Sequence, residues 1–133
     1  MIKTENGNDD DQIEVLYNEP KRGRVRMTAI KPIQDTAYAE ETHDGLVLVD
    51  FRSDWCPPCT AADRALTYLA SQTELARQVK FISLTVNRQP LIARALGVQS
   101  TPTIILKKNG QIVDAVIGPR SVTEFEALIK KHL

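Results

Sequence analysis

An almost entirely apolar run leads directly into the only two cysteines of this 133-residue chain. The run covers residues 46–51, and Cys56 and Cys59 follow it in the sequence Trp-Cys-Pro-Pro-Cys. A strand without polar alternation is typical of the centre of a parallel sheet that helices cover on both faces. Residues three apart share one face of a helix, so the two thiols can form a disulfide there. The pattern predicts a buried central strand that ends at a pair of neighbouring sulfurs.

The spacing of the two cysteines favours reversible redox chemistry over a structural cross-link. A disulfide that closes so short a loop restricts the unfolded chain very little and adds little stability. At a strand-to-helix junction, unpaired amide groups and the helix dipole favour the thiolate, which is the attacking form of cysteine. We therefore expect Cys56 to be the nucleophile and Cys59, one turn further along, to be the resolving thiol.

The rest of the chain alternates between strand patterns and helix patterns. The expected strands cover residues 25–30, 46–51, 81–86, 103–107 and 111–117. The expected helices cover residues 32–41, 57–79 with a break near residue 71, 91–96, and a last helix that starts at residue 121. This order predicts an α/β fold in which right-handed crossovers join the parallel strands.

Local signals mark several turns, caps and helix faces. Gly97 predicts a left-handed helix cap, and Asn109 followed by Gly110 predicts a two-residue hairpin turn. Ser121 and Glu124 have the spacing of a capping box. The apolar residues expected to face the core are Ala61, Ala65, Leu66 and Leu69 in the long helix, Leu91, Ile92, Ala95 and Leu96 in the next, and Val122, Phe125, Leu128 and Ile129 in the last.

The segment from residue 48 to residue 59 resembles the active-site strand and helix entry of the thioredoxin family. Three further stretches, at residues 100–103, 108–110 and 116–118, follow in the order found in that family. The resemblance implies a thioredoxin-like three-layer sandwich over residues 25–133, with a central mixed sheet between helices. Residues 1–24 are then an N-terminal extension, partly disordered, or else a docking arm or an added edge strand.

Asp50 stands in the otherwise apolar strand, where burial is costly and raises the pKa of a carboxyl. It either reaches solvent or a local amide, or it serves a function. The resemblance implies the second, a general base that deprotonates Cys59 through water. The family's usual lysine on the adjacent strand is replaced by Ser83, so we expect Asp50 to be harder to ionise than in a standard thioredoxin.

The resemblance also implies a substrate-binding surface around the cysteines. Trp55 is expected to form an exposed platform, and Pro102 to be a cis proline that leaves the backbone before it free to pair with substrate. The full set of expected substrate-binding residues is Trp55, Pro57, Pro58, Thr101, Pro102 and Gly118.

Three further positions depart from the family pattern. Pro57 replaces a common glycine and removes one amide near Cys56, which argues against a strong oxidant. Arg52 stands where many thioredoxins have tryptophan, and Thr60 where lysine commonly follows the second cysteine. These two changes touch the surface that partners and a reductase meet.

Composition sets limits on partners and cofactors. Formal net charge is zero, and no apolar stretch approaches the roughly 20 residues of a membrane span, so we expect neither nucleic acid nor membrane as partner. A zinc site needs about four ligands close together, and the two histidines, His43 and His132, are scattered far from the cysteine pair, so no metal and no other cofactor is expected. We expect a monomer.

The expected function is a thiol-disulfide oxidoreductase that reduces protein disulfides through the Cys56–Cys59 couple and is itself reduced by a reductase. The start of the chain lacks the apolar core of a signal peptide, which indicates the cytoplasm, although a processed or recombinant form of an exported protein looks the same. Two alternatives are an exported reductase or maturation factor, and a thioredoxin-fold binding module with a secondary redox role.

Overall fold

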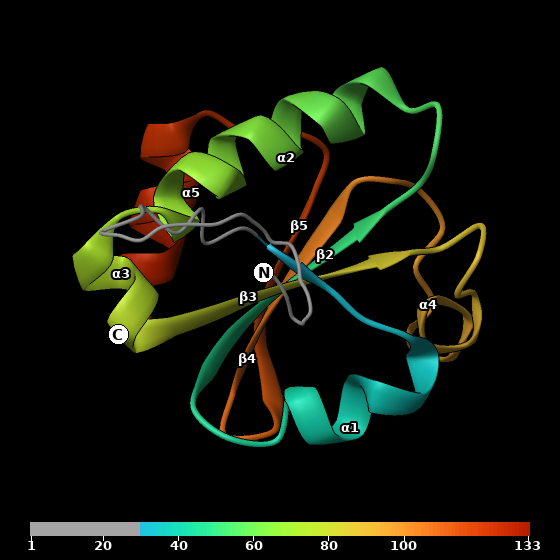
Figure 1. Cartoon of the computed structure of the whole chain (residues 1–133), viewed down its shortest axis with the longest axis horizontal. Helices are drawn as coiled ribbons and strands as arrows, with labels where there is room; N and C mark the ends of the chain where they lie inside the picture. Colours follow the sequence, from blue (N-terminus) through green and yellow to red (C-terminus); the bar gives the residue numbers. More distant parts are fainter. Residues whose placement is uncertain (1–29) are drawn as a thin grey trace, which may run out of the picture.

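The computed structural model describes residues 30–133, which form a five-stranded mixed sheet between two layers of helices (Figure 1). The strands are β1 (Lys31–Pro32), β2 (Leu46–Arg52), β3 (Val79–Thr85), β4 (Thr103–Lys108) and β5 (Gln111–Ile117). The helices are the 3-10 helix η1 (Asp35–Ala37), α1 (Tyr38–Glu41), α2 (Pro57–Ala70), α3 (Thr73–Gln78), α4 (Leu91–Leu96) and α5 (Val122–Lys130). The expected extension and all but the last residue of the strand expected over 25–30 lie outside the described residues.

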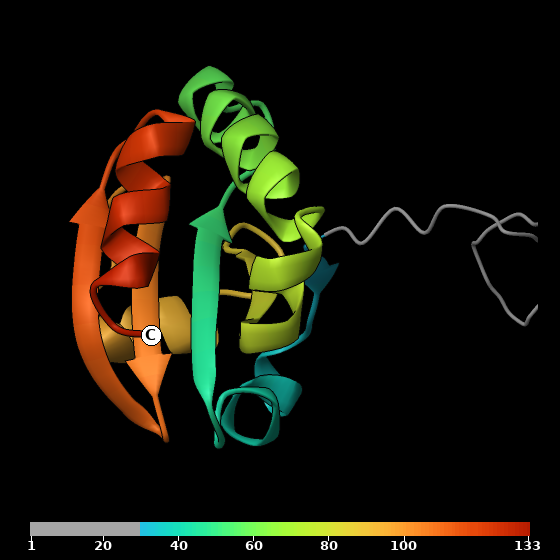
Figure 2. The same cartoon turned by 90° about the vertical axis from the view of Figure 1, so that its left-hand side faces the viewer.

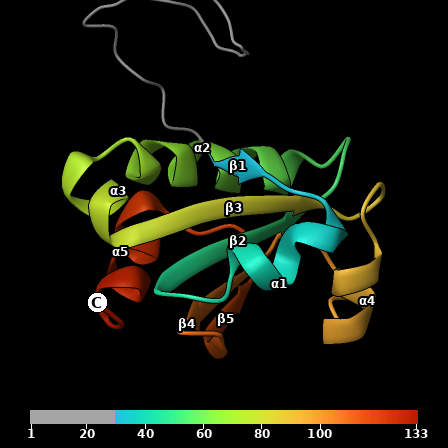
Figure 3. The same ribbon diagram turned by 60° about the horizontal axis from the view of Figure 1, so that its bottom comes forward.

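The sheet has the strand order β1-β3-β2-β4-β5, with β2 at its centre. Strand β2 is parallel to β3 and antiparallel to β4, so the sheet is mixed as expected. Helices α2, α3 and α5 cover one face, and α1 and α4 lie on the other (Figures 1 and 3). Within residues 30–133, every helix is too short or too polar to cross a bilayer.

Strand β2 is buried on both faces because two separate cores form on its two sides. Leu46 and Leu48 point into the cluster under α2 and α5, and these two helices lie side by side over the sheet (Figure 2). Val47, Val49 and Phe51 point into the cluster on the α1 and α4 side. Successive side chains of a strand alternate between its faces, so Asp50 and Arg52 face α2.

Most of the local signals have the predicted outcome. Asn109 and Gly110 have φ values of 52° and 86°, as a type I′ hairpin turn between β4 and β5 requires. Gly97 has a φ of 78° and ends α4 as a left-handed cap. Ser121 and Glu124 form the reciprocal capping box of α5. The long helical segment breaks between α2 and α3, close to the predicted residue 71.

The helix predicted over residues 32–41 starts later than expected. Pro32 lies in β1, and the amide of Ile33 donates to the Ser83 carbonyl 2.9 Å away, which keeps this segment extended along β3. The Asp35 carboxylate then accepts from the amides of Leu91 and Ile92 at 3.0 and 3.1 Å, at the start of α4. These contacts span more than 50 residues of sequence, so local periodicity does not contain them.

Two of the predicted helix faces are wrong in part. In α2, Ala62 is buried and Ala61 is exposed, because the face that carries Cys59 turns toward the sheet. In α4, Ala93 is the buried residue, and Leu91 is 60% exposed. The other two predicted core residues of α4 that are exposed are Ala95 and Leu96. Helix α4 has only six residues, too few for an apolar stripe to fix which side faces the core.

Candidate active site

Cys56 and Cys59 form a disulfide at the start of α2, just beyond the carboxyl end of the central strand. Cys56 is the N-cap residue of the helix, and the Cα atoms of the two cysteines are 5.2 Å apart. Cys56 is partly exposed, whereas Cys59 is fully buried against the sheet. A molecule arriving from solvent therefore meets the sulfur of Cys56 first.

The Cys56 sulfur accepts one backbone hydrogen bond. The Cys59 amide lies 3.2 Å from it, and Pro57 and Pro58 have no amide hydrogen to offer. The next amide, that of Thr60, donates to the Cys56 carbonyl at 3.0 Å instead. The two prolines thus leave this sulfur a single amide donor at the helix start, as expected from the sequence.

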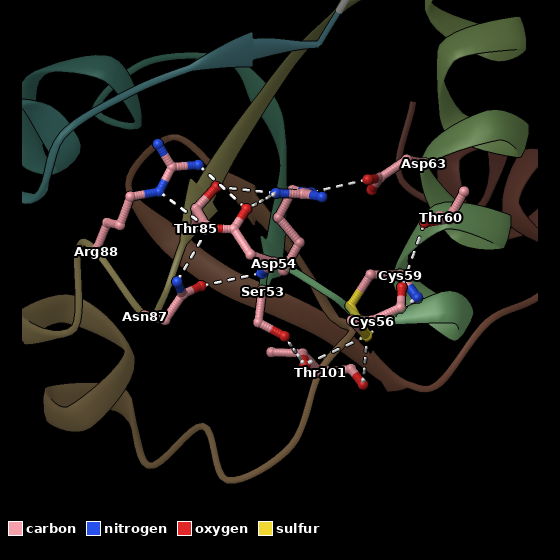
Figure 4. Close-up of polar contacts among 11 residues, drawn as sticks. Ser53, Asp54, Cys56, Cys59, Thr60, Asp63, Thr85, Asn87, Arg88 and Thr101 are labelled. Atoms are coloured by element: carbon pink, nitrogen blue, oxygen red, sulfur yellow. Dashed lines mark hydrogen bonds and ion pairs between the residues drawn. A yellow bond between two sulfur atoms is a disulfide. The ribbon is translucent and has the colours of Figure 1, made fainter.

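Thr101 lies on the other side of the Cys56 sulfur, as Figure 4 shows. Its carbonyl oxygen is 3.8 Å and its hydroxyl 3.7 Å from the sulfur. The same hydroxyl is 2.8 Å from the Ser53 hydroxyl, a contact between distant segments that has no local signal in the sequence. The Thr101–Pro102 bond is cis, Pro102 is buried, and its carbonyl accepts from the Gly118 amide at 2.8 Å.

Trp55 is 99% exposed and has a φ of 58°, a conformation that bulky residues rarely adopt. The residue before it is held in place: Asn87 bonds both the amide and the carboxylate of Asp54, and Arg88 also contacts that carboxylate (Figure 4). The Asn87 hydrogen bond and the Arg88 charge lower the pKa of Asp54. Asn87 and Arg88 carry no recognisable signal in the sequence, because they reach the site only through the loop after β3.

Asp50 is fully buried in β2, opposite Ser83 of β3 and Ile104 of β4. Neither of its carboxylate oxygens has a hydrogen-bond donor from the described residues. Burial, followed by hydrogen bonding to Asp63 and the charge of Asp63, raises the pKa of Asp50 to about 9, against the opposing charge of Arg52. Asp50 is therefore a neutral carboxyl at pH 7 in this disulfide state.

The charged residues that act on the pKa of Asp50 are Arg52 of β2 and Asp63 of α2. The Nε atom of Arg52 is 2.8 Å from an Asp63 oxygen, and its Nη1 is 3.1 Å from the Thr85 hydroxyl. The Arg52 side chain is about one-quarter exposed. Its guanidinium contacts Asp63 and Thr85, whereas the sequence predicted that it would lie on the surface that partners meet. Asp63 was missed in the sequence, although its position four residues after Cys59 places it on the same helix face.

Comparison with known proteins agrees with this geometry. The sequence model of the family described as Thioredoxin matches residues 29–131. A thioredoxin of Listeria monocytogenes is 35% identical over 104 residues, which are 78% of this chain and 99% of that protein. A thioredoxin of Bacillus subtilis is 31% identical over 105 residues, or 79% and 99%.

Solved structures show the same likeness. The oxidized form of mitochondrial thioredoxin 3 from Saccharomyces cerevisiae has a TM-score of 0.67 and 29% identity, covering 77% of this chain and 94% of that one. A mutant thioredoxin from Halobacterium salinarum has a TM-score of 0.70 and 27% identity, covering 83% and 96%. The family match, the curated relatives and the cysteine pair at the end of β2 together show that this chain belongs to the thioredoxin family of thiol-disulfide oxidoreductases.

Proposed function

We propose that Cys56 is the attacking thiol of this oxidoreductase and Cys59 the resolving thiol. Exposure carries the assignment, because Cys56 faces solvent at the helix start and Cys59 is fully buried. The Cys59 amide and the Thr101 hydroxyl are both placed to donate to a Cys56 thiolate. No comparable donor to the Cys59 sulfur exists among the hydrogen bonds of residues 30–133, so Cys59 is the less easily ionised thiol.

The reaction then runs in two exchange steps. The Cys56 thiolate attacks one sulfur of a substrate disulfide, a bond forms between them, and the other substrate sulfur leaves as a thiolate that solvent protonates. The Cys59 thiolate then attacks Cys56, the intramolecular disulfide forms, and the first substrate sulfur leaves. Two electrons pass from the dithiol to the substrate, and the protein is left in the disulfide state described above.

Asp50 is the proton acceptor that we assign to the second step. Cys59 must lose its proton before it attacks, and Asp50 lies on the strand beneath the helix that carries Cys59. Its pKa of about 9 in the disulfide state is close to the value of about 8.5 for a free thiol, so the transfer is nearly balanced in energy. We assign the transfer to one bridging water. When the disulfide is next reduced, protonated Asp50 returns the proton to the leaving Cys59 sulfur, so Asp50 is ionised again before the next resolving step.

Substrate protein binds, in this proposal, over the exposed side of Cys56. Trp55, Pro57 and Pro58 form one edge of this binding surface. The backbone around the cis proline Pro102 forms the other edge, where an extended substrate segment can pair with it. The assigned substrate-binding residues are Trp55, Pro57, Pro58, Thr101, Pro102 and Gly118.

The partners follow from the chemistry. Disulfide-containing proteins are the oxidants, and a reductase must restore the dithiol after each turnover. We propose that the protein acts as a monomer in the cytoplasm, where an isolated cysteine pair is more often catalytic than structural.

Single cysteine variants test the two roles. Cys59→Ser, mixed with a small disulfide-bonded protein, should accumulate a mixed disulfide that dithiothreitol releases, because the resolving thiol is absent. Cys56→Ser is the matched control and should accumulate none, since its remaining thiol is buried. A mixed disulfide formed through Cys59 in Cys56→Ser would reverse the assignment.

A further inference from the structure

Within residues 30–133, three buried carboxylate oxygens of β2 and α2 lack a donor, and they belong to two side chains that hydrogen-bond each other. They are both oxygens of Asp50 and the Oδ1 atom of Asp63, and no protein group among the described residues donates to any of them. A buried acceptor without a donor is costly, and two ionised carboxylates side by side are costlier still. One proton between the two residues removes the repulsion and gives Asp63 Oδ1 a donor, because a neutral carboxyl donates to an ionised one.

Arg52 forms an ion pair with Asp63. It bonds the Oδ2 atom of Asp63 at 2.8 Å and leaves Oδ1 free to accept. In Figure 4, Asp63 lies on α2 further along the helix than Cys59, and its position four residues after Cys59 places both on the same helix face. The carboxylate of Asp63 therefore stands on the helix that carries the resolving thiol and faces the strand that carries Asp50.

We propose that Asp63, anchored by Arg52, is a positioning residue that accepts a hydrogen bond from protonated Asp50 and thereby holds the proton taken from Cys59. The proposal rests on the general-base role of Asp50 in the proposed function and adds a second carboxylate to it. Asp63 does not touch the sulfur chemistry itself. It acts by setting how tightly Asp50 keeps its proton, and Arg52 limits that tightening with its positive charge.

The charges around Asp50 are few enough for this assignment to be tested. Among the described residues, Asp63 of α2 and Arg52 of β2 are the charged groups that act on its pKa. Its strand neighbours Ser83 and Ile104 carry no charge. The charge of Asp63 raises the pKa of Asp50 and the charge of Arg52 lowers it, so removing one or the other has opposite effects.

The test is a carbon-13 NMR titration of the Asp50 carboxyl in the oxidised full chain. Asp63→Asn should lower the midpoint by at least about one pH unit, because a repelling charge is replaced by an amide that can donate to ionised Asp50. Arg52→Gln should raise the midpoint. Asp54→Asn is the matched control, since Asp54 also approaches Arg52, at 3.9 Å, from the exposed side, and its removal should leave the midpoint within about 0.3 units.

Opposite shifts in the two variants support the proposal, because general loosening of the site moves both midpoints down toward the ordinary aspartate value. An unchanged midpoint in Asp63→Asn, or shifts of the same sign in both variants, overturns it. If Asp63→Asn does not fold, the sign of the Arg52→Gln shift decides. The titration uses no turnover, so it is independent of the proposed function, which fails instead if Asp50→Asn resolves mixed disulfides at the wild-type rate.

Discussion

Replacing Asp50 with asparagine should stabilise the oxidised protein by an amount that grows with pH. Aspartate in an unfolded chain ionises near pH 3.9, whereas burial raises the pKa of Asp50 to about 9 in the folded protein. Between these values the folded state keeps a proton that the unfolded state has released. The contribution of Asp50 to the stability of the wild type is therefore greatest below about pH 4 and falls as the pH rises toward 9.

The size of the effect follows from the same two values. Each pH unit in this window costs the wild type up to about 1.4 kcal/mol, so the three units from pH 4 to pH 7 cost up to about 4 kcal/mol. The asparagine side chain introduced by the substitution does not titrate, and its amide can donate to the free oxygen of Asp63. Any constant offset from the substitution cancels when the two proteins are compared across pH, because only the slope carries the information.

The assay is guanidinium unfolding of the oxidised wild type and Asp50→Asn at each pH from 4 to 9. The difference in unfolding free energy should increase steadily in favour of the variant. Asp54→Asn is the control, because contacts with Asn87 and Arg88 lower the pKa of this exposed carboxyl and its removal gives no advantage that grows with pH. A difference that stays flat between pH 5 and pH 8 would show that Asp50 is ionised in the folded state, and the reasoning would then be wrong.

Three other predictions concern the cysteine site and the fold. Thr101→Val should slow iodoacetamide alkylation of reduced Cys56 at pH 7 by roughly two- to ten-fold, because it removes a hydroxyl 3.7 Å from the sulfur and a hydrogen bond contributes about 0.5–1.5 kcal/mol. Titration in glutathione and dithiothreitol buffers should give a redox potential nearer about −270 mV than about −120 mV, because one amide donor reaches Cys56, and a value above about −200 mV would contradict the reductase assignment. Gly97→Ala should lower the unfolding free energy by about 1 kcal/mol, because φ is 78° there and an alanine is strained in that conformation. No atom lies within 4 Å of an added Cβ, so a clash adds nothing, and thermal unfolding measures the loss of stability.

Elements whose signals are local could be predicted from the sequence. The apolar run of β2, the turn at Asn109, the cap at Gly97 and the capping box at Ser121 each depend on neighbouring residues, and each is found where expected. The cysteine pair belongs to the same class, since its spacing and its position after a strand are both local.

Features that depend on contacts between distant segments could not be predicted. Helix α1 starts late because Asp35 binds the start of α4, and Trp55 has a left-handed backbone next to a residue that Asn87 and Arg88 hold. Periodicity along one segment contains no information about the other partner in these contacts. The position of Asp63 on the helix face of Cys59 is a local signal, but the role proposed for Asp63 depends on a strand that precedes it in sequence and lies beneath α2 in space.

Two positions that depart from the family pattern, Ser83 and Arg52, both lie close to Asp50 in the folded protein. The resemblance implies a lysine where Ser83 stands on the strand beside Asp50, and Arg52 carries a positive charge two residues further along the strand of Asp50, on the same face. The new cation is engaged by Asp63 at 2.8 Å, so it does not simply replace the missing lysine. Its charge lowers the pKa of Asp50, whereas burial and Asp63 raise it, and the net effect is upward. Burial and the acidic neighbour Asp63 therefore make Asp50 hard to ionise in this chain, a cause separate from the lysine that the resemblance implies at position 83.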